Sequence, residues 1–172
     1  MNPKICKIFE TCENLDYTLL TTALDLAETG HAGAFRRNSN TPYVEHPKQV
    51  AKLLRLWGVE DSEVLAAAFA HDLLEDSKEL TEAHIEERLG KNVLSMVKAL
   101  SHNKDTETKV EYISRLSLHD DLMPVLIKAA DRFCNTIDFI ISREKDPVSY
   151  FHAADAIFKR LGDDQEKLGE IY

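Results

Sequence analysis

The chain has 172 residues and a mass of 19.5 kDa, which is enough for one domain with a sizeable core. Its hydrophobic fraction of 44% is ordinary for a globular protein, and no apolar run approaches the ~20 residues that span a bilayer. The formal net charge of −9 argues against non-specific binding to nucleic acid, but it allows a small phosphorylated ligand at a local basic cluster. We therefore expect a single domain over residues 1–172, with neither nucleic acid nor a membrane as its partner.

The cysteines and the amino terminus indicate the compartment. Cys6, Cys12 and Cys134 form neither a metal-type C-x-x-C pair nor an even disulfide set. The first residues lack the long apolar core of a signal peptide. The sequence therefore predicts a reducing, cytoplasmic setting.

Apolar residues at helical spacing predict a first helix over about 15–29, which Gly30 and Gly33 end. A polar loop follows over residues 35–43. Pro47 is expected as the first residue of the next helix, with His46 at its cap. That helix should turn its apolar residues, Trp57 among them, to the inside.

An uninterrupted apolar run occupies residues 64–70 and predicts a central, buried helix, capped by Asp61 or Ser62. We expect this helix to continue to residue 76. One continuous helix would place His71 over Glu75 and Asp72 over Asp76. Unpaired polar groups are costly to bury, so a buried helix has no structural reason to end in four of them. A bound metal ion would supply a reason.

The second half of the chain carries further helical patterns and no convincing alternation of period two. We expect helices over 82–89 (capped by residue 81 and ended by residue 90), 93–100, 107–118 (weakly), 123–141 and 147 to about 161. The helix over 123–141 should place Phe133, Ile137 and Ile140 inside. The predicted fold class is all-α.

His46 and Asp131 are the residues most suited to join His71 and Asp72. Asp131 interrupts an apolar helix face, where a carboxylate must be paired or ligated. An ion pair with Lys128 or Arg132 is the alternative explanation. Two histidines and two carboxylates suit a six-coordinate divalent ion, Mn²⁺ first and Fe²⁺, Mg²⁺ or Zn²⁺ behind it. Such an ion would lower the pKa of a water and neutralise charge on a phosphoryl group.

Basic and polar residues near these positions are candidates for binding a phosphorylated substrate. Guanidinium groups bind phosphate through paired hydrogen bonds, which favours Arg36 and, less strongly, Arg37, although a solvated surface pair is the alternative. Lys128 and Asn135 lie three and four residues from Asp131 and share its helix face, so both are candidates for contacting such a substrate. Tyr43 is a further candidate, unless it simply packs.

The motifs containing these residues, taken together, resemble the RelA/SpoT-type hydrolase domain of the HD superfamily of metal-dependent phosphohydrolases. Residues 42–47 read PYVEHP and resemble its PYxxHP signature. Residues 71–76 read HDLLED and resemble its HDxxED box, while residues 128–135 resemble its KxADRxxN segment. Arg36 and Arg37 stand where that family places a basic pair. The resemblance implies a compact HD-domain helical bundle.

The resemblance also implies an activity, namely hydrolysis of the 3′-diphosphate of (p)ppGpp to pyrophosphate and GDP or GTP. By analogy, one Mn²⁺ would be held by His46, His71, Asp72 and Asp131. Glu75 and Asp76 would position and activate the attacking water. Lys128 would meet phosphate and Asn135 the sugar or base, while Tyr43 would either stack on the base or simply pack. The chain would then be a small alarmone hydrolase without synthetase activity.

Two departures from the family pattern leave alternatives open. Cys134 stands where the family usually has a histidine, and residues 101–122 lack a clear counterpart of its VTKL segment. Another HD-type nucleotide phosphohydrolase, for example a 5′-nucleotidase, is the first alternative. A non-catalytic HD binding module is the second, although every expected ligand and both acidic residues are present.

Overall fold

The computed structural model describes residues 3–9, 14–37, 39–142 and 147–164. Within these ranges the regular structure is α-helical, apart from an isolated β-bridge between Phe35 and Pro42. The predicted all-α class is therefore confirmed. Among the described residues, no helix is long and apolar enough to cross a membrane.

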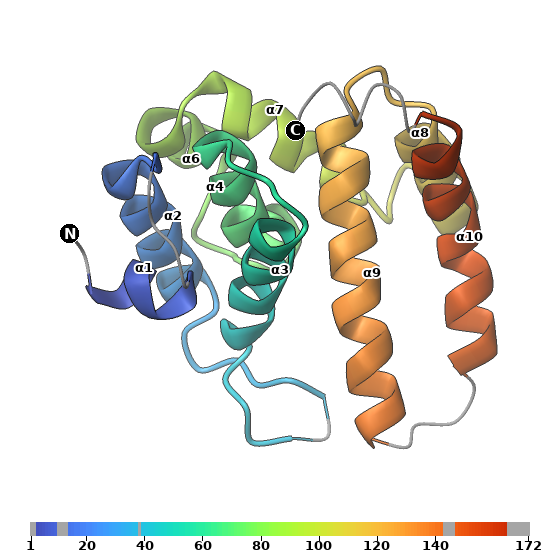
Figure 1. Ribbon diagram of the computed structural model, residues 1–172, viewed down its shortest axis with the longest axis horizontal. Helices are drawn as coiled ribbons and strands as arrows, with labels where there is room; N and C mark the ends of the chain where they lie inside the picture. Colours follow the sequence, from blue (N-terminus) through green and yellow to red (C-terminus); the bar gives the residue numbers. More distant parts are fainter. Residues whose placement is uncertain (1–2, 10–13, 38, 143–146, 165–172) are drawn as a thin grey trace. The chain divides into compact units, whose positions relative to one another are not determined.

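The chain divides into two compact units, Met1–Ser101 and His102–Tyr172, and each is described by itself. The prediction of a single domain stays a prediction. The first unit contains α1 to α7 and the second contains α8 to α10 (Figure 1). The helices are α1 (Pro3–Ile8), α2 (Tyr17–Gly30), α3 (Glu45–Leu56), α4 (Ser62–Ala70), α5 (Leu73–Asp76), α6 (Glu82–Leu89), α7 (Lys91–Leu100), α8 (Lys109–Ser117), α9 (Leu122–Ser142) and α10 (Pro147–Asp163).

Helix α4 forms the centre of the first unit, where it packs against α2, α3 and α7. Each of its residues from Val64 to Ala70 is at most 1% exposed, and a buried side chain of the size of leucine or phenylalanine contributes roughly 1.5–3 kcal/mol. The predicted cap is confirmed, since the Asp61 carboxylate accepts a hydrogen bond from the Glu63 N–H at 2.7 Å. The apolar run therefore fixes the position of the polar residues that follow it.

The prediction of one helix through residue 76 is wrong, because α4 ends at Ala70 and a separate turn, α5, follows. The His71 ring is the physical reason. Its Nδ1–H donates to the Ala68 carbonyl at 2.8 Å, so a side chain satisfies a carbonyl at the helix end. The N–H groups of Glu75 and Asp76 then both bond to the carbonyl of Asp72. Asp72 and Asp76 stay one turn apart as expected, whereas His71 and Glu75 do not share a helix.

Helix α3 begins at Glu45 instead of Pro47, so His46 lies in the first turn and is not the cap. A proline fits anywhere in the first turn, because the N–H groups there have no partner inside the helix. The His46 N–H bonds back to the Tyr43 carbonyl at 2.9 Å. Trp57, predicted inside, is 36% exposed after the end of the helix.

The end of α2 lies close against α5. A Cβ atom added to Gly30 would lie 2.5 Å from Cδ2 of Leu73 and 3.0 Å from Cδ1 of Leu80. Only glycine lets the two backbones approach this closely without displacing the buried Leu73 side chain. Gly30 thus brings the residue after α2, His31, beside the turn that carries Asp72.

In the second unit, α10 packs against α8 and α9 and runs antiparallel to α9 (Figure 1). Helix α9 was predicted with Phe133, Ile137 and Ile140 inside, but their exposures are 44%, 42% and 60%. This prediction is wrong because the helices that pack on α9 leave this face open in the second half of α9. The covered part of α9 is its first half, which contains Lys128 and Asp131.

A candidate metal and phosphate site

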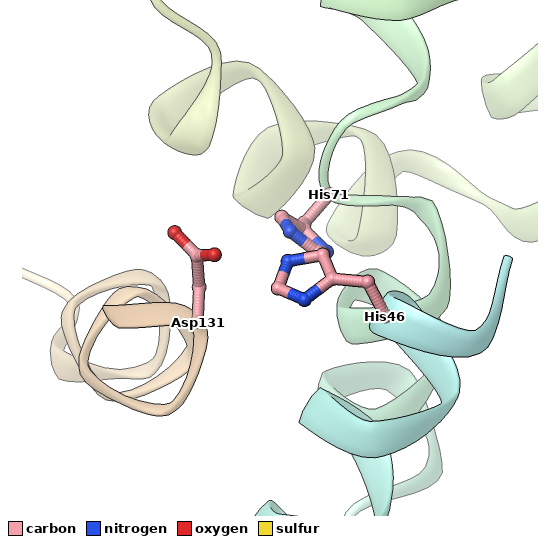
Figure 2. A group of neighbouring side chains, drawn as sticks. All are labelled: His46, His71 and Asp131. Atoms are coloured by element: carbon pink, nitrogen blue, oxygen red, sulfur yellow. The ribbon is translucent and has the colours of Figure 1, made fainter. Parts of the chain in front are cut away.

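Two histidines and one carboxylate of the first unit turn their donor atoms toward one another. Nε2 of His71 lies 3.0 Å, and Nε2 of His46 lies 4.0 Å, from Oδ2 of Asp72. The two imidazole rings, drawn in Figure 2, meet edge to face, and their centroids lie 5.3 Å apart. Both histidines are 1% exposed. Three elements supply this group: the first turn of α3, the end of α4 and the bend before α5.

The hydrogen bond from His71 to Ala68 determines which nitrogen of the ring is available. Because Nδ1 carries the proton, Nε2 of the neutral ring presents a lone pair to the carboxylate 3.0 Å away. Two lone pairs at that distance require a cation between them, either a proton or a metal ion. A metal-bound histidine commonly donates its other N–H to a backbone carbonyl in this way.

The spacing of these atoms fits a six-coordinate ion. Ligand atoms about 2.1 Å from an octahedral ion lie about 3.0 Å apart when adjacent and about 4.2 Å apart when opposite. The separations of 3.0 Å for His71 and 4.0 Å for His46 from the Asp72 oxygen lie within the range that two ligands of one such ion would span. The first unit can therefore contribute three ligands to one ion.

Asp131 of the second unit is a buried carboxylate that projects from α9 (Figure 2). Its Oδ2 lies 2.9 Å from the Lys128 ammonium, and its Oδ1 accepts a hydrogen bond from the Asn135 amide. The predicted common face of Lys128, Asp131 and Asn135 is therefore confirmed. The alternative ion pair with Lys128 is also present. Each carboxylate oxygen has a second lone pair, so these partners leave Asp131 able to bind a metal ion.

Cations gather around Lys128 in this acidic protein. Burial lowers the pKa of Lys109, and the positive charges of Arg132 and Lys128 lower it further. Lys128 and Arg132 are 7% and 6% exposed, and Lys128 Nζ lies 5.5 Å from the centre of the Tyr112 ring. A group of cations of this kind attracts a polyanion. Sequence reasoning considered Arg132 only as a partner of Asp131. It missed Lys109, which no motif marks.

Tyr43 contacts Asp72. Its hydroxyl donates to Oδ2 of Asp72 at 2.8 Å, and its ring lies 4.6 Å from that of His31. Burial, followed by the charge of Asp72, holds the pKa of the Tyr43 hydroxyl far above its usual range, so this group remains a donor at any working pH. Sequence reasoning did not count His31 as a ligand. It missed both the hydrogen bond to Asp72 and the packing of His31 against Tyr43.

The remaining predicted residues of the first unit lie at its surface. Glu75 and Asp76 are exposed on α5, where solvent reaches both carboxylates. Arg36 is half-buried with its guanidinium 5.4 Å from the centre of the Tyr43 ring, whereas Arg37 is exposed. This difference favours Arg36 over Arg37 as a phosphate ligand. The buried nitrogen donors of His46 and His71 suit a divalent metal ion.

Comparison with known proteins gives a family match over most of the chain. A family model described as an HD domain matches residues 23–165. The chain is similar to a solved structure, described as a metazoan ortholog of SpoT that hydrolyses ppGpp, with a TM-score of 0.76 and 25% identity. That match covers 85% of this chain and 86% of the other. The predicted HD fold is confirmed.

Named relatives are of two lengths. The guanosine-3′,5′-bis(diphosphate) 3′-pyrophosphohydrolase MESH1 of Xenopus tropicalis is 33% identical over 129 residues, 72% of this chain and 70% of that protein. A probable guanosine-3′,5′-bis(diphosphate) 3′-pyrophosphohydrolase of Synechocystis is 35% identical over 120 residues, and the enzyme of that name in Haemophilus influenzae is 34% identical over 118 residues. Each of these two matches covers 64% of this chain, which spans only 15% and 17% of the respective relatives.

Proposed function

Since this chain belongs to the HD-domain family, we propose that it is a metal-dependent hydrolase that removes the 3′-diphosphate of (p)ppGpp. The observation that carries the proposal is the convergence of His46, His71 and Asp72, with the His71 tautomer set by the Ala68 carbonyl. A buried group of this kind needs a cation. The names of the MESH1 relative and of the bacterial relatives supply the substrate class.

We propose Asp131 as the fourth ligand, and with it that both units form one HD domain. The family model supports this because its match over residues 23–165 runs through both units. The mixed nitrogen and oxygen donors favour Mn²⁺, with Fe²⁺, Mg²⁺ or Zn²⁺ as alternatives. When bound, the ion would supply a Lewis acid that lowers the pKa of a water and neutralises phosphoryl charge.

Glu75 and Asp76 are proposed to position the attacking water and to accept its proton. Their carboxylates are solvent-exposed one turn after Asp72, so they can accept a proton and release it to solvent. The water oxygen forms a bond to the phosphorus attached to O3′, and the bond from that phosphorus to O3′ breaks. The leaving oxygen takes a proton and becomes the 3′-hydroxyl, which yields pyrophosphate and GDP or GTP.

Substrate binding is assigned to the cations around these groups. Arg36 beside Tyr43 and Lys128 beside Asp131 are proposed to bind phosphate oxygens, with Arg37 contributing less because it is exposed. Asn135 is proposed to contact the sugar or base. The substrate is thus a small nucleotide, and a cytoplasmic location, expected from the cysteines, remains part of the proposal.

The test is pyrophosphate release from ppGpp by protein freed of metal and then supplied with Mn²⁺. We expect turnover with Mn²⁺ and none with a chelator. A His71→Ala preparation, purified in parallel, controls for contaminating phosphatases. Release of inorganic phosphate from 5′-mononucleotides, with ppGpp untouched, would instead identify a 5′-nucleotidase. Metal binding without turnover of any nucleotide would identify a binding module.

A further inference from the structure

We propose that Tyr43 and His31 are positioning residues that hold the carboxylate of Asp72 ready for a metal ion. This role differs from stacking on a nucleotide base, which the sequence alone left open for Tyr43. The inference rests on the metal site of the proposed function but does not depend on the identity of the substrate. All the residues that carry it lie in the first unit.

The Tyr43 hydroxyl bonds to the one oxygen of Asp72 that the histidines also face. Oδ2 of Asp72 accepts from Tyr43 Oη at 2.8 Å and lies 3.0 Å from Nε2 of His71. Asp72 is located at the bend between α4 and α5, outside both helices, with its side chain 16% exposed. Rotation about the bond to its carboxyl group would take Oδ2 away from the histidines. The hydrogen bond from Tyr43 opposes that rotation.

The Tyr43 ring is itself held from two sides. Its centroid lies 5.9 Å from that of His46, edge to face, and 4.6 Å from that of His31. These contacts keep the phenol in one orientation, so its hydroxyl meets Asp72 without a further loss of side-chain freedom. A group whose rotamer is fixed by packing is an effective support for a metal ligand.

His31 supports the Tyr43 ring by packing against it. It follows α2 directly, its N–H bonds to the Ala27 carbonyl, and it is 5% exposed. Burial is the largest cause that lowers its pKa, so the ring is neutral at pH 7. Its Nε2 is buried without a hydrogen-bond partner among the residues that the structure describes. The ring therefore supports Tyr43 by packing, which a phenylalanine would reproduce.

The test measures Mn²⁺ binding to metal-free protein by calorimetry, with no nucleotide present. Substitutions of groups that support metal ligands typically lower metal affinity by 10- to 100-fold, and we expect a loss in that range for Tyr43→Phe. His31→Ala should weaken Mn²⁺ binding in the same direction, whereas His31→Phe should bind as the unaltered protein does. Tyr17→Phe is the matched control, because it removes a hydroxyl at the first residue of α2, about 20 Å along the helix axis from His31.

Circular dichroism of each variant separates a lost contact from a failure to fold. Tyr43→Phe that folds and binds Mn²⁺ with unchanged affinity would overturn the proposal, and a raised KM for ppGpp in that variant would then assign the Tyr43 hydroxyl to substrate binding. His31→Phe that weakens binding as much as His31→Ala would overturn the packing role of His31. If the unaltered protein binds no divalent ion, the proposed metal site fails, and that result is distinct from either of these.

Discussion

At the scale of single residues, His71 connects the fold to the chemistry. The same ring bonds to the last turn of α4 through Nδ1 and presents Nε2 to Asp72, so its structural role and its proposed ligating role share one tautomer. Glu75 and Asp76 differ from it in being exposed and outside the buried group of donors. Their substitution should therefore affect proton transfer, while substitution of His71 should affect metal binding.

We predict that His71→Ala loses both bound metal and turnover. Glu75→Gln should retain the metal but lower kcat by 100-fold or more, because general base catalysis typically contributes roughly 10²- to 10⁴-fold. Metal content by mass spectrometry, measured beside pyrophosphate release, separates the two effects. Glu79→Gln, an exposed acid just after α5, is the control and should behave as the unaltered protein. Loss of metal from Glu75→Gln would contradict the proton-accepting role.

At the scale of elements, the approach of α2 to α5 depends on one glycine. Gly30 lies in the last turn of α2, and a Cβ atom there would lie 2.5 Å from the Leu73 side chain. Leu73 is fully buried, so it cannot move aside without disturbing the packing beneath Asp72. The close approach thus links the helix that carries His31 to the turn that carries the carboxylates.

We predict that Gly30→Ala lowers the free energy of unfolding by up to about 2 kcal/mol, because overpacking a core costs about 1–3 kcal/mol. Alanine is the better helix former by roughly 1 kcal/mol, so the measured loss is the overpacking cost reduced by that gain. Gly162→Ala in α10 is the matched control, since its added Cβ meets nothing within 4 Å and should stabilise the helix slightly. Urea denaturation measures both. A stabilised Gly30→Ala would show that Leu73 yields freely.

Helices were largely predictable from the sequence because their signals are local. Thr81 caps α6 and Gly90 ends it with φ at 89°, as the sequence predicts. The bend at residues 71–72 was not predictable, because it depends on a side chain bonding to the preceding turn. The exposed face of α9 depends on which of its faces the neighbouring helices cover, and no periodicity within α9 reports that cover.

The candidate site was likewise predictable in part, in its residues but not in their contacts. The identities of His46, His71, Asp72 and Asp131 follow from residue type and motif, since buried titratable residues need a reason. The contacts that support them did not follow. Neither the bond from Tyr43 to Asp72 nor the approach of Lys109 to Lys128 has a sequence signal, because each joins residues from segments that no periodicity relates.

At the scale of the whole molecule, the proposed ligand set takes residues from both units. His46, His71 and Asp72 belong to Met1–Ser101, and Asp131 belongs to His102–Tyr172. A ligand that binds only the native state stabilises it by mass action. If Asp131 completes the site, the stabilisation by Mn²⁺ must depend on a residue of the second unit, although three ligands lie in the first.

We predict that Mn²⁺ at 100 times its dissociation constant raises the free energy of unfolding by about 2.7 kcal/mol, and that a chelator abolishes the gain. Asp131→Asn should lose most of this gain at the same Mn²⁺ concentration, because an amide replaces the anionic ligand. Hydrogen exchange should then show Mn²⁺-dependent protection of α3 and α4 in the unaltered protein and little in the variant. Asp155→Asn on α10, which removes an exposed pair with Lys159, is the control and should keep the full gain. A full gain in Asp131→Asn would confine the metal ligands to the first unit.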